Sequence, residues 1–303
     1  MTLTQFITDS DVRNAIDNSF PKPNKKVNEE IKYEPKTKHY SLIGQAFDYI
    51  ARFWIEKQSD TVRKQEWTAS YGLDIVKQQI PSHAQTCEQA YENAVYEYEK
   101  YIKTGKFNQE TAKASIDLAR LTSAYRGQSR PLNYIGEYDD GDIEDCLNLY
   151  DGLDESNCLS CSESVLNPSF EEISKLVGNA DADIIIDNKL IDIKTTKNGS
   201  FKIDYWRQLV GYAILVDLYN ELHEDDNSYP DINTLCIYYS RHGVLKEINA
   251  DAVYDNPNYK EFRAWLIDKA LGEYSSLSRT DKNKLREQFC EPYDYSNYMN
   301  AER

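Results

Sequence analysis

Three residues in an apolar stretch have the types and spacing that could hold a metal ion beside a phosphate. Residues i and i+2 of a strand face the same way, so Asp192 and Lys194 should point out together. Ile191 and Ile193 would then enter the core. Asp183 lies ahead of a neighbouring apolar run, where a hairpin would bring it within reach. Two carboxylates with waters and a phosphate oxygen suit Mg²⁺, and the ammonium can orient or polarise a water.

A second polar pair follows on the next expected helix. An Asp-x-Lys on a strand is most often a solvated edge pair, so alone it indicates little. Gln208 and Tyr212 are spaced i and i+4, which puts them on one face of a segment that is otherwise apolar. With Asp183, this polar stripe favours a functional site over an edge pair.

The order of these residues resembles a known nuclease family. Asp, then Asp-x-Lys, then QxxxY is similar to the RecB-like branch of the PD-(D/E)xK nuclease superfamily. The residues that carry the match are Asp183, Asp192, Lys194, Gln208 and Tyr212. Members also have a glycine followed four residues later by a histidine, a spacing found here in Gly44 and Asp48, with aspartate in place of histidine. The resemblance covers residues 183 to 212 and the helix expected at 44 to 56.

The resemblance implies a fold and a set of metal ligands. The fold would be mixed α/β, with a restriction-endonuclease-like core, a small central mixed β-sheet flanked by helices, and a helical insertion. One or two Mg²⁺ or Mn²⁺ ions would be held by Asp183, Asp192 and the carbonyl of Ile193. Asp48 would be a further ligand.

The implied activity is metal-dependent hydrolysis of DNA phosphodiester bonds, in repair, recombination or defence. The metal would stabilise the charge that grows on the phosphate and the leaving oxygen. Lys194 would help to activate the attacking water. Gln208 and Tyr212 would steady the DNA backbone or the lysine. Because the chain has no GxxxxGK[ST] phosphate loop, any helicase motor would be a separate chain.

The bulk composition limits these expectations. The chain has 303 residues and 40% hydrophobic residues, enough for a substantial core, but its net charge of −16 argues against a broad DNA-binding face. Five basic residues stand against two acidic ones between Lys189 and Arg207, so the sign should be reversed locally. No apolar run could span a membrane, and the first residues lack the features of a secretory signal, so a cytoplasmic location is expected.

Two other functions stay open. One is a nuclease fold kept for DNA binding or assembly with little turnover, which the acidic charge and Asp48 favour. The other is a metal-binding scaffold built on Cys146, Cys158 and Cys161, although a second CxxC is missing and reduced thiols are the simpler expectation. The four histidines show no paired spacing and are expected at the surface.

The elements that must position these residues can be outlined along the chain. Residues 1–40 are polar and read as a loosely packed lead-in, followed by a nuclease-like domain over 41–303 that contains a helical insertion and acidic connector at 60–163. Gly105 should break the insertion into a helical hairpin over 82–126, and 127–163 should be irregular. The expected core segments are strands at 184–186 and 190–193, a helix at 203–222 with Asp204 as N-cap, a strand at 234–240 with its partner at 244–248, and helices after 258.

Overall fold

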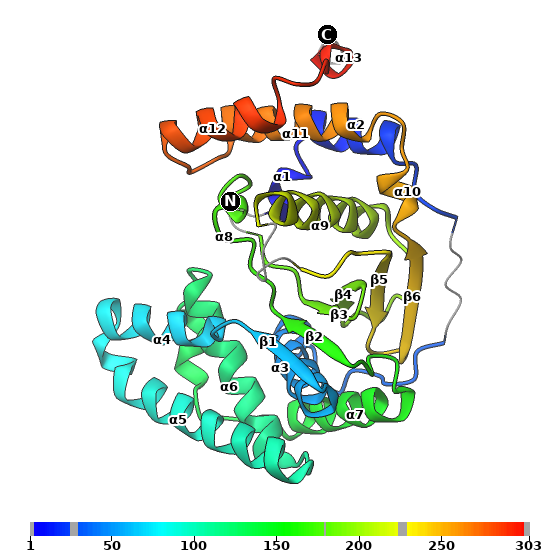
Figure 1. Ribbon diagram of the computed structural model, residues 1–303. Helices are drawn as coiled ribbons and strands as arrows, with labels where there is room; N and C mark the ends of the chain where they lie inside the picture. Colours follow the sequence, from blue (N-terminus) through cyan, green and yellow to red (C-terminus); the bar gives the residue numbers. More distant parts are fainter. Residues whose placement is uncertain (1–2, 25–29, 179, 224–228, 300–303) are drawn as a thin grey trace.

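One mixed β-sheet forms the centre of the protein. A computed structural model describes residues 3–24, 30–178, 180–223 and 229–299 (Figure 1). The sheet order is β1-β2-β3-β4-β5-β6, with β1–β2 and β4–β5 parallel and the other pairs antiparallel. The strands are β1 (Thr61–Lys64), β2 (Glu163–Leu166), β3 (Ile184–Ile186), β4 (Lys189–Lys194), β5 (Thr234–Tyr239) and β6 (Val244–Asn249). The mixed α/β class expected from the sequence is therefore confirmed.

Helices occupy both faces of this sheet and extend to one side of it. Those before the third strand are α1 (Leu3–Phe6), α2 (Ser10–Ser19), α3 (Tyr40–Gln58), α4 (Thr68–Gln79), α5 (Pro81–Thr104), α6 (Gln109–Tyr125), the 3₁₀ helix η1 (Arg130–Tyr134), α7 (Asp140–Ser156) and α8 (Glu171–Ser174). Those after it are α9 (Ile203–Leu222), α10 (Asp251–Tyr254), α11 (Tyr259–Glu273), α12 (Arg279–Phe289) and α13 (Ser296–Met299). None of these described helices has the length and apolar character needed to cross a bilayer.

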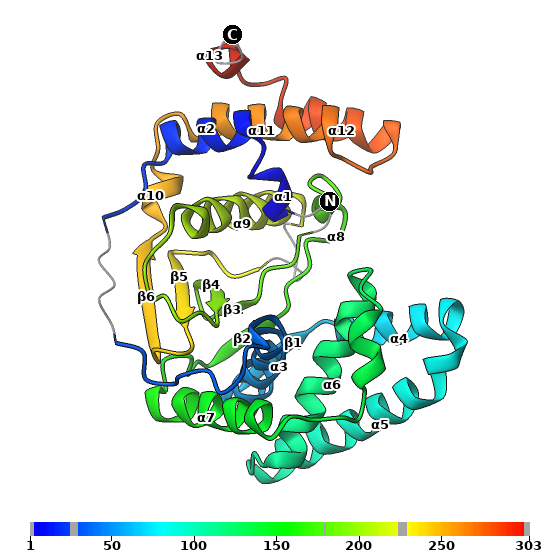
Figure 2. The same cartoon turned by 180° about the vertical axis from the view of Figure 1, so that it is seen from behind.

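Alternate residues of the strands feed two separate cores. Ile185 and Leu190 join the core beneath α9, whereas Ile184 and Ile191 join the core against α3 and α7. Figures 1 and 2 show α9 on one side of the sheet and α3 and α7 on the other. Because successive residues point to opposite faces, the register decides which side chains of β4 lie under α9.

The β3–β4 hairpin has the expected pairing. Ile184 lies opposite Ile191 and Ile186 opposite Lys189, with Asp187 in the left-handed region at φ +48°. The predicted β5–β6 pair is also confirmed. The parallel neighbours β4 and β5 are joined through α9, which crosses over the sheet between them.

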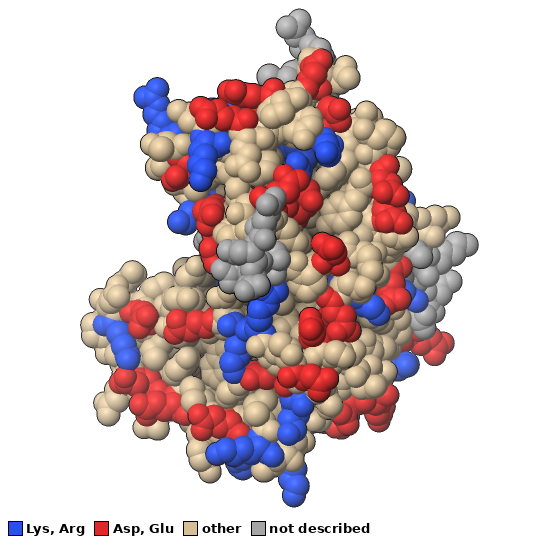
Figure 3. Space-filling view, viewed as in Figure 1, with Lys and Arg blue, Asp and Glu red and all other residues tan. Residues whose placement is uncertain are grey.

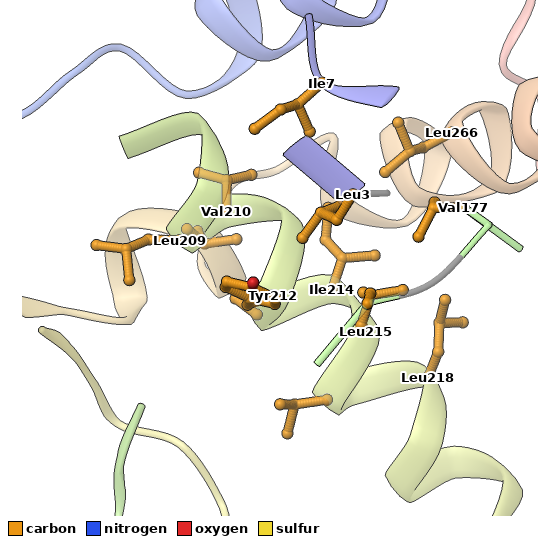
Figure 4. Close-up of a cluster of buried hydrophobic side chains, with 14 of the residues drawn as sticks. Leu3, Ile7, Val177, Leu209, Val210, Tyr212, Ile214, Leu215, Leu218 and Leu266 are labelled. Atoms are coloured by element: carbon orange, nitrogen blue, oxygen red, sulfur yellow. The ribbon is translucent and has the colours of Figure 1, made fainter. Parts of the chain in front are cut away.

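The helix α9 is buried on nearly all sides. Its residues Leu209, Val210, Ile214 and Leu215 pack among side chains from α1 and α11 as well as against the sheet (Figure 4). Its start differs from the expectation, because the N-cap is Lys202 and Asp204 lies inside the first turn.

The first residues are packed rather than loose. Leu3, Phe6 and Ile16 are buried in the same core as α9, and α2 carries an N-cap at Asp9 that accepts from two backbone amides. The expectation of a loosely packed lead-in was wrong for residues 3–20. The polar composition of residues 1–40 as a whole obscured the apolar positions of the two short helices α1 and α2.

The acidic segment 127–163 was expected to be irregular, and this was wrong for the residues that form η1, α7 and the start of β2. α7 occupies its middle, with Ile143, Cys146, Leu149 and Leu153 buried at helical spacing against α3. Asn157 ends the helix in the left-handed conformation, and β2 follows. The helix forms because this narrow apolar stripe is buried, whatever the charge on its other face.

Helices α4, α5 and α6 form a lobe beside the sheet (Figure 1). Gly105 ends α5 at φ +68°, as the predicted break in the helical hairpin requires. α4 packs against α6 at Gly72, where a Cβ would lie 2.0 Å from the Leu121 carbonyl oxygen. The insertion is thus a close-packed three-helix unit.

Candidate functional site

Strand β4 brings Asp192 and Lys194 to the face that α9 covers. They share a face as predicted, but they do not point into open solvent, because Asp192 is only 2% exposed and lies between the sheet and the helix. The Lys194 ammonium lies 2.6 Å from Asp192 Oδ2, and its side chain is 19% exposed. The pair is therefore a nearly enclosed ion pair at the carboxyl end of the strand.

Asp183 lies at the neighbouring position across the hairpin. The β3–β4 register, continued by one residue, sets Asp183 opposite Asp192. Its Oδ2 accepts a hydrogen bond from the Ile193 amide at 2.7 Å. The N–H and C=O of a strand residue point to the same side, so the Ile193 carbonyl also faces this edge. The hairpin thus brings Asp183 beside Asp192 and Ile193, the three residues that the resemblance implies as metal ligands.

Lys194 is held by a chain of hydrogen bonds from α9. Its ammonium donates to Gln208 Oε1 at 3.0 Å, and Gln208 Nε2 donates to the Tyr212 hydroxyl at 3.2 Å. The Tyr212 hydroxyl donates in turn to the Asp181 carbonyl at 2.9 Å. Gln208 and Tyr212 therefore do share one face of the helix, and they fix the lysine against the strand.

Burial and like charges perturb the acids of this site. Burial, with the nearby Asp192 and Asp48 carboxylates, raises the pKa of Asp183 to about 7. Burial likewise raises the pKa of Asp192. Burial would lower the pKa of Lys194, but Asp192 and Asp183 outweigh it and raise that pKa, so the ammonium stays charged near neutrality.

Arg52 is a member of the site that the sequence analysis missed. It is 6% exposed and forms an ion pair with Asp48, one turn earlier on α3. Asp183 also contributes to raising the pKa of Arg52, so the guanidinium lies close to both carboxylates. The i,i+4 spacing of Asp48 and Arg52 was visible in the sequence, but it does not distinguish a buried pair from an exposed one.

The donor set fits a hard divalent cation in type. Asp183 and Asp192 offer carboxylates and Ile193 a carbonyl. Asp192 Oδ2 is buried, and the Lys194 ammonium is its close polar neighbour in the described chain. In residues 3–24, 30–178, 180–223 and 229–299, however, Asp48, Asp183 and Asp192 form no group whose oxygens all lie within 4.8 Å of one another. Asp48 is turned to Arg52 instead.

A second group of potential metal ligands lies where α8 meets the end of α9. Glu171, Glu172 and His223 place one oxygen or nitrogen each within 4.8 Å of one another. His223 Nδ1 lies 2.9 Å from the Tyr219 carbonyl oxygen, and Nε2 is on the side of the glutamates. Exposed acidic groups like this are common without an ion. Nothing in the sequence links these residues, because α8 and the end of α9 meet only in the fold.

The cysteines do not form a metal centre in the described part of the chain. All six are free thiols, and none belongs to a group of three or more metal-ligating side chains. Cys146 is buried against α3, and Cys161 Sγ lies 3.2 Å from the Ser59 hydroxyl. The cysteines thus act as small core and edge residues.

The basic run from Lys189 to Arg207 does not form a free positive patch. Its ion pairs are Lys189–Glu247, Lys194–Asp192, Lys197–Glu34, and Arg207 with Asp17 and Asp204. Figure 3 shows acidic and basic side chains interspersed on the face in view, which is notched between α4 and α12. Lys202 is the basic residue of the run without an ion pair in the described ranges, and its ammonium lies 5.5 Å from the centre of the Tyr205 ring. The expected local reversal of charge was therefore wrong for the other four, because carboxylates within the run and distant from it neutralise them.

Comparison of the chain with protein-family models, with curated proteins and with solved structures finds no match.

Proposed function

We propose that this protein is a metal-dependent deoxyribonuclease of the PD-(D/E)xK type, with a restriction-endonuclease-like core. The observation that carries the proposal is the meeting of Asp183, Asp192 and the charged Lys194 at the end of one strand, locked by Gln208 and Tyr212. Perturbed acids paired with a positioned cation are typical of functional sites.

The surroundings of each residue support a role for it in DNA hydrolysis. Asp183, Asp192 and the Ile193 carbonyl would hold Mg²⁺ or Mn²⁺, which when bound supplies charge stabilisation at the scissile phosphate. Lys194 is charged, so it would orient the attacking water and neutralise the phosphate rather than remove a proton. Gln208 fixes the ammonium by accepting its hydrogen bond. Tyr212 fixes Gln208.

The test is an assay of linear and circular DNA with the purified protein. We expect degradation with Mg²⁺ or Mn²⁺ and none in EDTA. Lys194→Ala should reduce the rate by at least about 10²-fold, because it removes a cation aimed at the reacting phosphate. The matched control is Lys189→Ala, which removes a lysine from the other end of the same strand, where it pairs with Glu247.

The control variant should cut DNA at a rate close to that of the parent. Equal rates for the parent and Lys194→Ala, with both folded by circular dichroism, would contradict the assignment. Thermal unfolding of both variants separates loss of chemistry from loss of structure.

A second function is favoured by one observation. Arg52 already supplies a buried positive charge to Asp48, beside Asp183. A protein in which the Arg52 guanidinium holds this position could bind DNA, or assemble with another chain, while hydrolysing little DNA. It predicts DNA retention without cleavage, unchanged by Lys194→Ala.

A further inference from the structure

A cavity lies beside the carboxylate site, between helices of the lobe and the start of α3. It has a volume of about 980 Å³ and lies among the start of α3, the end of α6, η1 and the start of α7. This volume is at the upper end of the range of small-molecule pockets. None of Asp48, Asp183, Asp192, Lys194, Gln208 and Tyr212 lines it, so it is a separate feature of the surface.

Cations without an ion pair line this cavity. Lys38 and Arg130 are exposed and form no ion pair with any residue in the described ranges. Of the acids that line the cavity, Asp139 caps α7, and Asp142 accepts from Thr37 and lies 2.9 Å from His39 Nδ1. Glu137 also lines it, is exposed and forms no ion pair in the described ranges. The cavity therefore offers two unpaired cations, Lys38 and Arg130, beside the one unpaired carboxylate of Glu137, in a protein of net charge −16.

Two exposed tyrosines line the same cavity. The large hydrophobic side chains exposed in the described chain are Tyr40, Tyr71, Tyr96, Tyr125 and Tyr134. Tyr40 and Tyr134, at 47% and 48% exposed, line the cavity itself. Tyr71 and Tyr125 lie 5.9 Å apart on the adjoining helices α4 and α6. Free aromatic faces beside free cations are the two features that bind unpaired nucleotides without sequence preference.

The cavity lies next to the carboxylate site. Gln45 lines it and stands three residues before Asp48 on α3, so the two side chains are neighbours about one helical turn apart. Gly44, at the start of α3, packs against Thr195, since a Cβ added to it would lie 3.8 Å from Thr195 Cβ. Thr195 follows Lys194 in the sequence. A strand held in the cavity would thus lead toward the end of β4.

We propose that this cavity binds a single-stranded segment of DNA, with bases stacked on Tyr40 and Tyr134 and phosphates contacted by Lys38 and Arg130. This inference rests on the proposed nuclease function and deepens it by naming the form of the substrate. Bases in a duplex keep their faces covered by their neighbours, so only an unpaired strand can use the tyrosines. The strand would pass from the cavity to the carboxylates along α3.

The test measures binding in EDTA, so that it does not depend on cleavage. Fluorescence anisotropy with a labelled single-stranded oligonucleotide and with the matching duplex compares the parent with Tyr40→Ala/Arg130→Ala. We expect the parent to prefer the single strand and the double variant to bind it about tenfold or more weakly. The slope of log affinity against log salt should shrink by about 0.7 for the lost phosphate contact.

The matched control is Tyr96→Ala/Lys103→Ala, which removes one exposed tyrosine and one exposed cation from α5, away from the cavity. It should leave the affinity within about twofold of the parent value. Equal loss in both double variants, equal binding of duplex and single strand, or no binding at all would overturn the cavity assignment. The Lys194→Ala assay tests cleavage separately, so a failure of the cavity assignment would not by itself contradict the nuclease proposal.

Discussion

The acid–base state of the site depends on Asp183. This carboxyl combines burial with two neighbouring carboxylates, and its pKa near 7 makes it the group that changes charge around neutrality. Strand alternation alone could predict that Asp192 and Lys194 share a face. It could not predict that α9 closes over them, nor that Arg52 joins from α3, because both depend on how distant elements pack.

In the absence of metal, the pH dependence of the free energy of unfolding should reflect the titration of Asp183. An acid with a higher pKa in the folded than in the unfolded chain binds more protons when folded, so the free energy of unfolding falls as pH rises from about 4 to 7. Asp183→Asn keeps an acceptor for the Ile193 amide and cannot ionise. We expect it to be more stable than the parent by at least about 1 kcal/mol at pH 8, with little difference at pH 4.

Thermal unfolding in EDTA across this pH range measures the effect. The control is Asp255→Asn, an exposed aspartate outside the site, which should unfold in parallel with the parent at each pH. A difference between Asp183→Asn and the parent that does not grow with pH would show that Asp183 is ionised throughout.

Among the elements, the sequence predicted best those whose conformation depends on one buried face or one turn. The β3–β4 hairpin, the α9 segment and the β5–β6 pair follow from alternation, apolar runs and turn residues. α2 and α7 were missed because a charged composition masked their narrow apolar stripes. β1 was missed because its few residues are partly exposed and pair with a strand about a hundred residues away.

The three-helix lobe depends on close contact at Gly72. A methyl group there would meet the Leu121 carbonyl, and backbone cannot move aside as a side chain can. We expect Gly72→Ala to destabilise the protein by at least about 2 kcal/mol. Gly272→Ala is the matched control, since it lies in α11 with nothing within 4 Å of the added Cβ.

Denaturant unfolding of the two variants compares them directly. Gly272→Ala should be neutral or more stable by up to about 1 kcal/mol, from helix propensity alone. A Gly72→Ala protein as stable as Gly272→Ala would mean that α4 and α6 can separate at no cost. The lobe that carries Tyr71 and Tyr125 would then be looser than the structure describes.

The whole molecule is acidic, and this affects how a metal site must be tested. With net charge −16 and most of its basic run paired with carboxylates, the protein should attract divalent cations at many places. Loss of activity in EDTA would then not identify a site. The structure offers two locations, the end of β4 and the Glu171, Glu172 and His223 group, and they lie on different elements.

The most direct measurement is therefore the position of a bound metal, by anomalous diffraction from crystals soaked in Mn²⁺. We predict a peak between the carboxylates of Asp183 and Asp192, within about 2.3 Å of an oxygen of each, and its loss in Asp192→Asn. A peak confined to Glu171, Glu172 and His223, or an empty site at the end of β4 under saturating Mn²⁺, would contradict it.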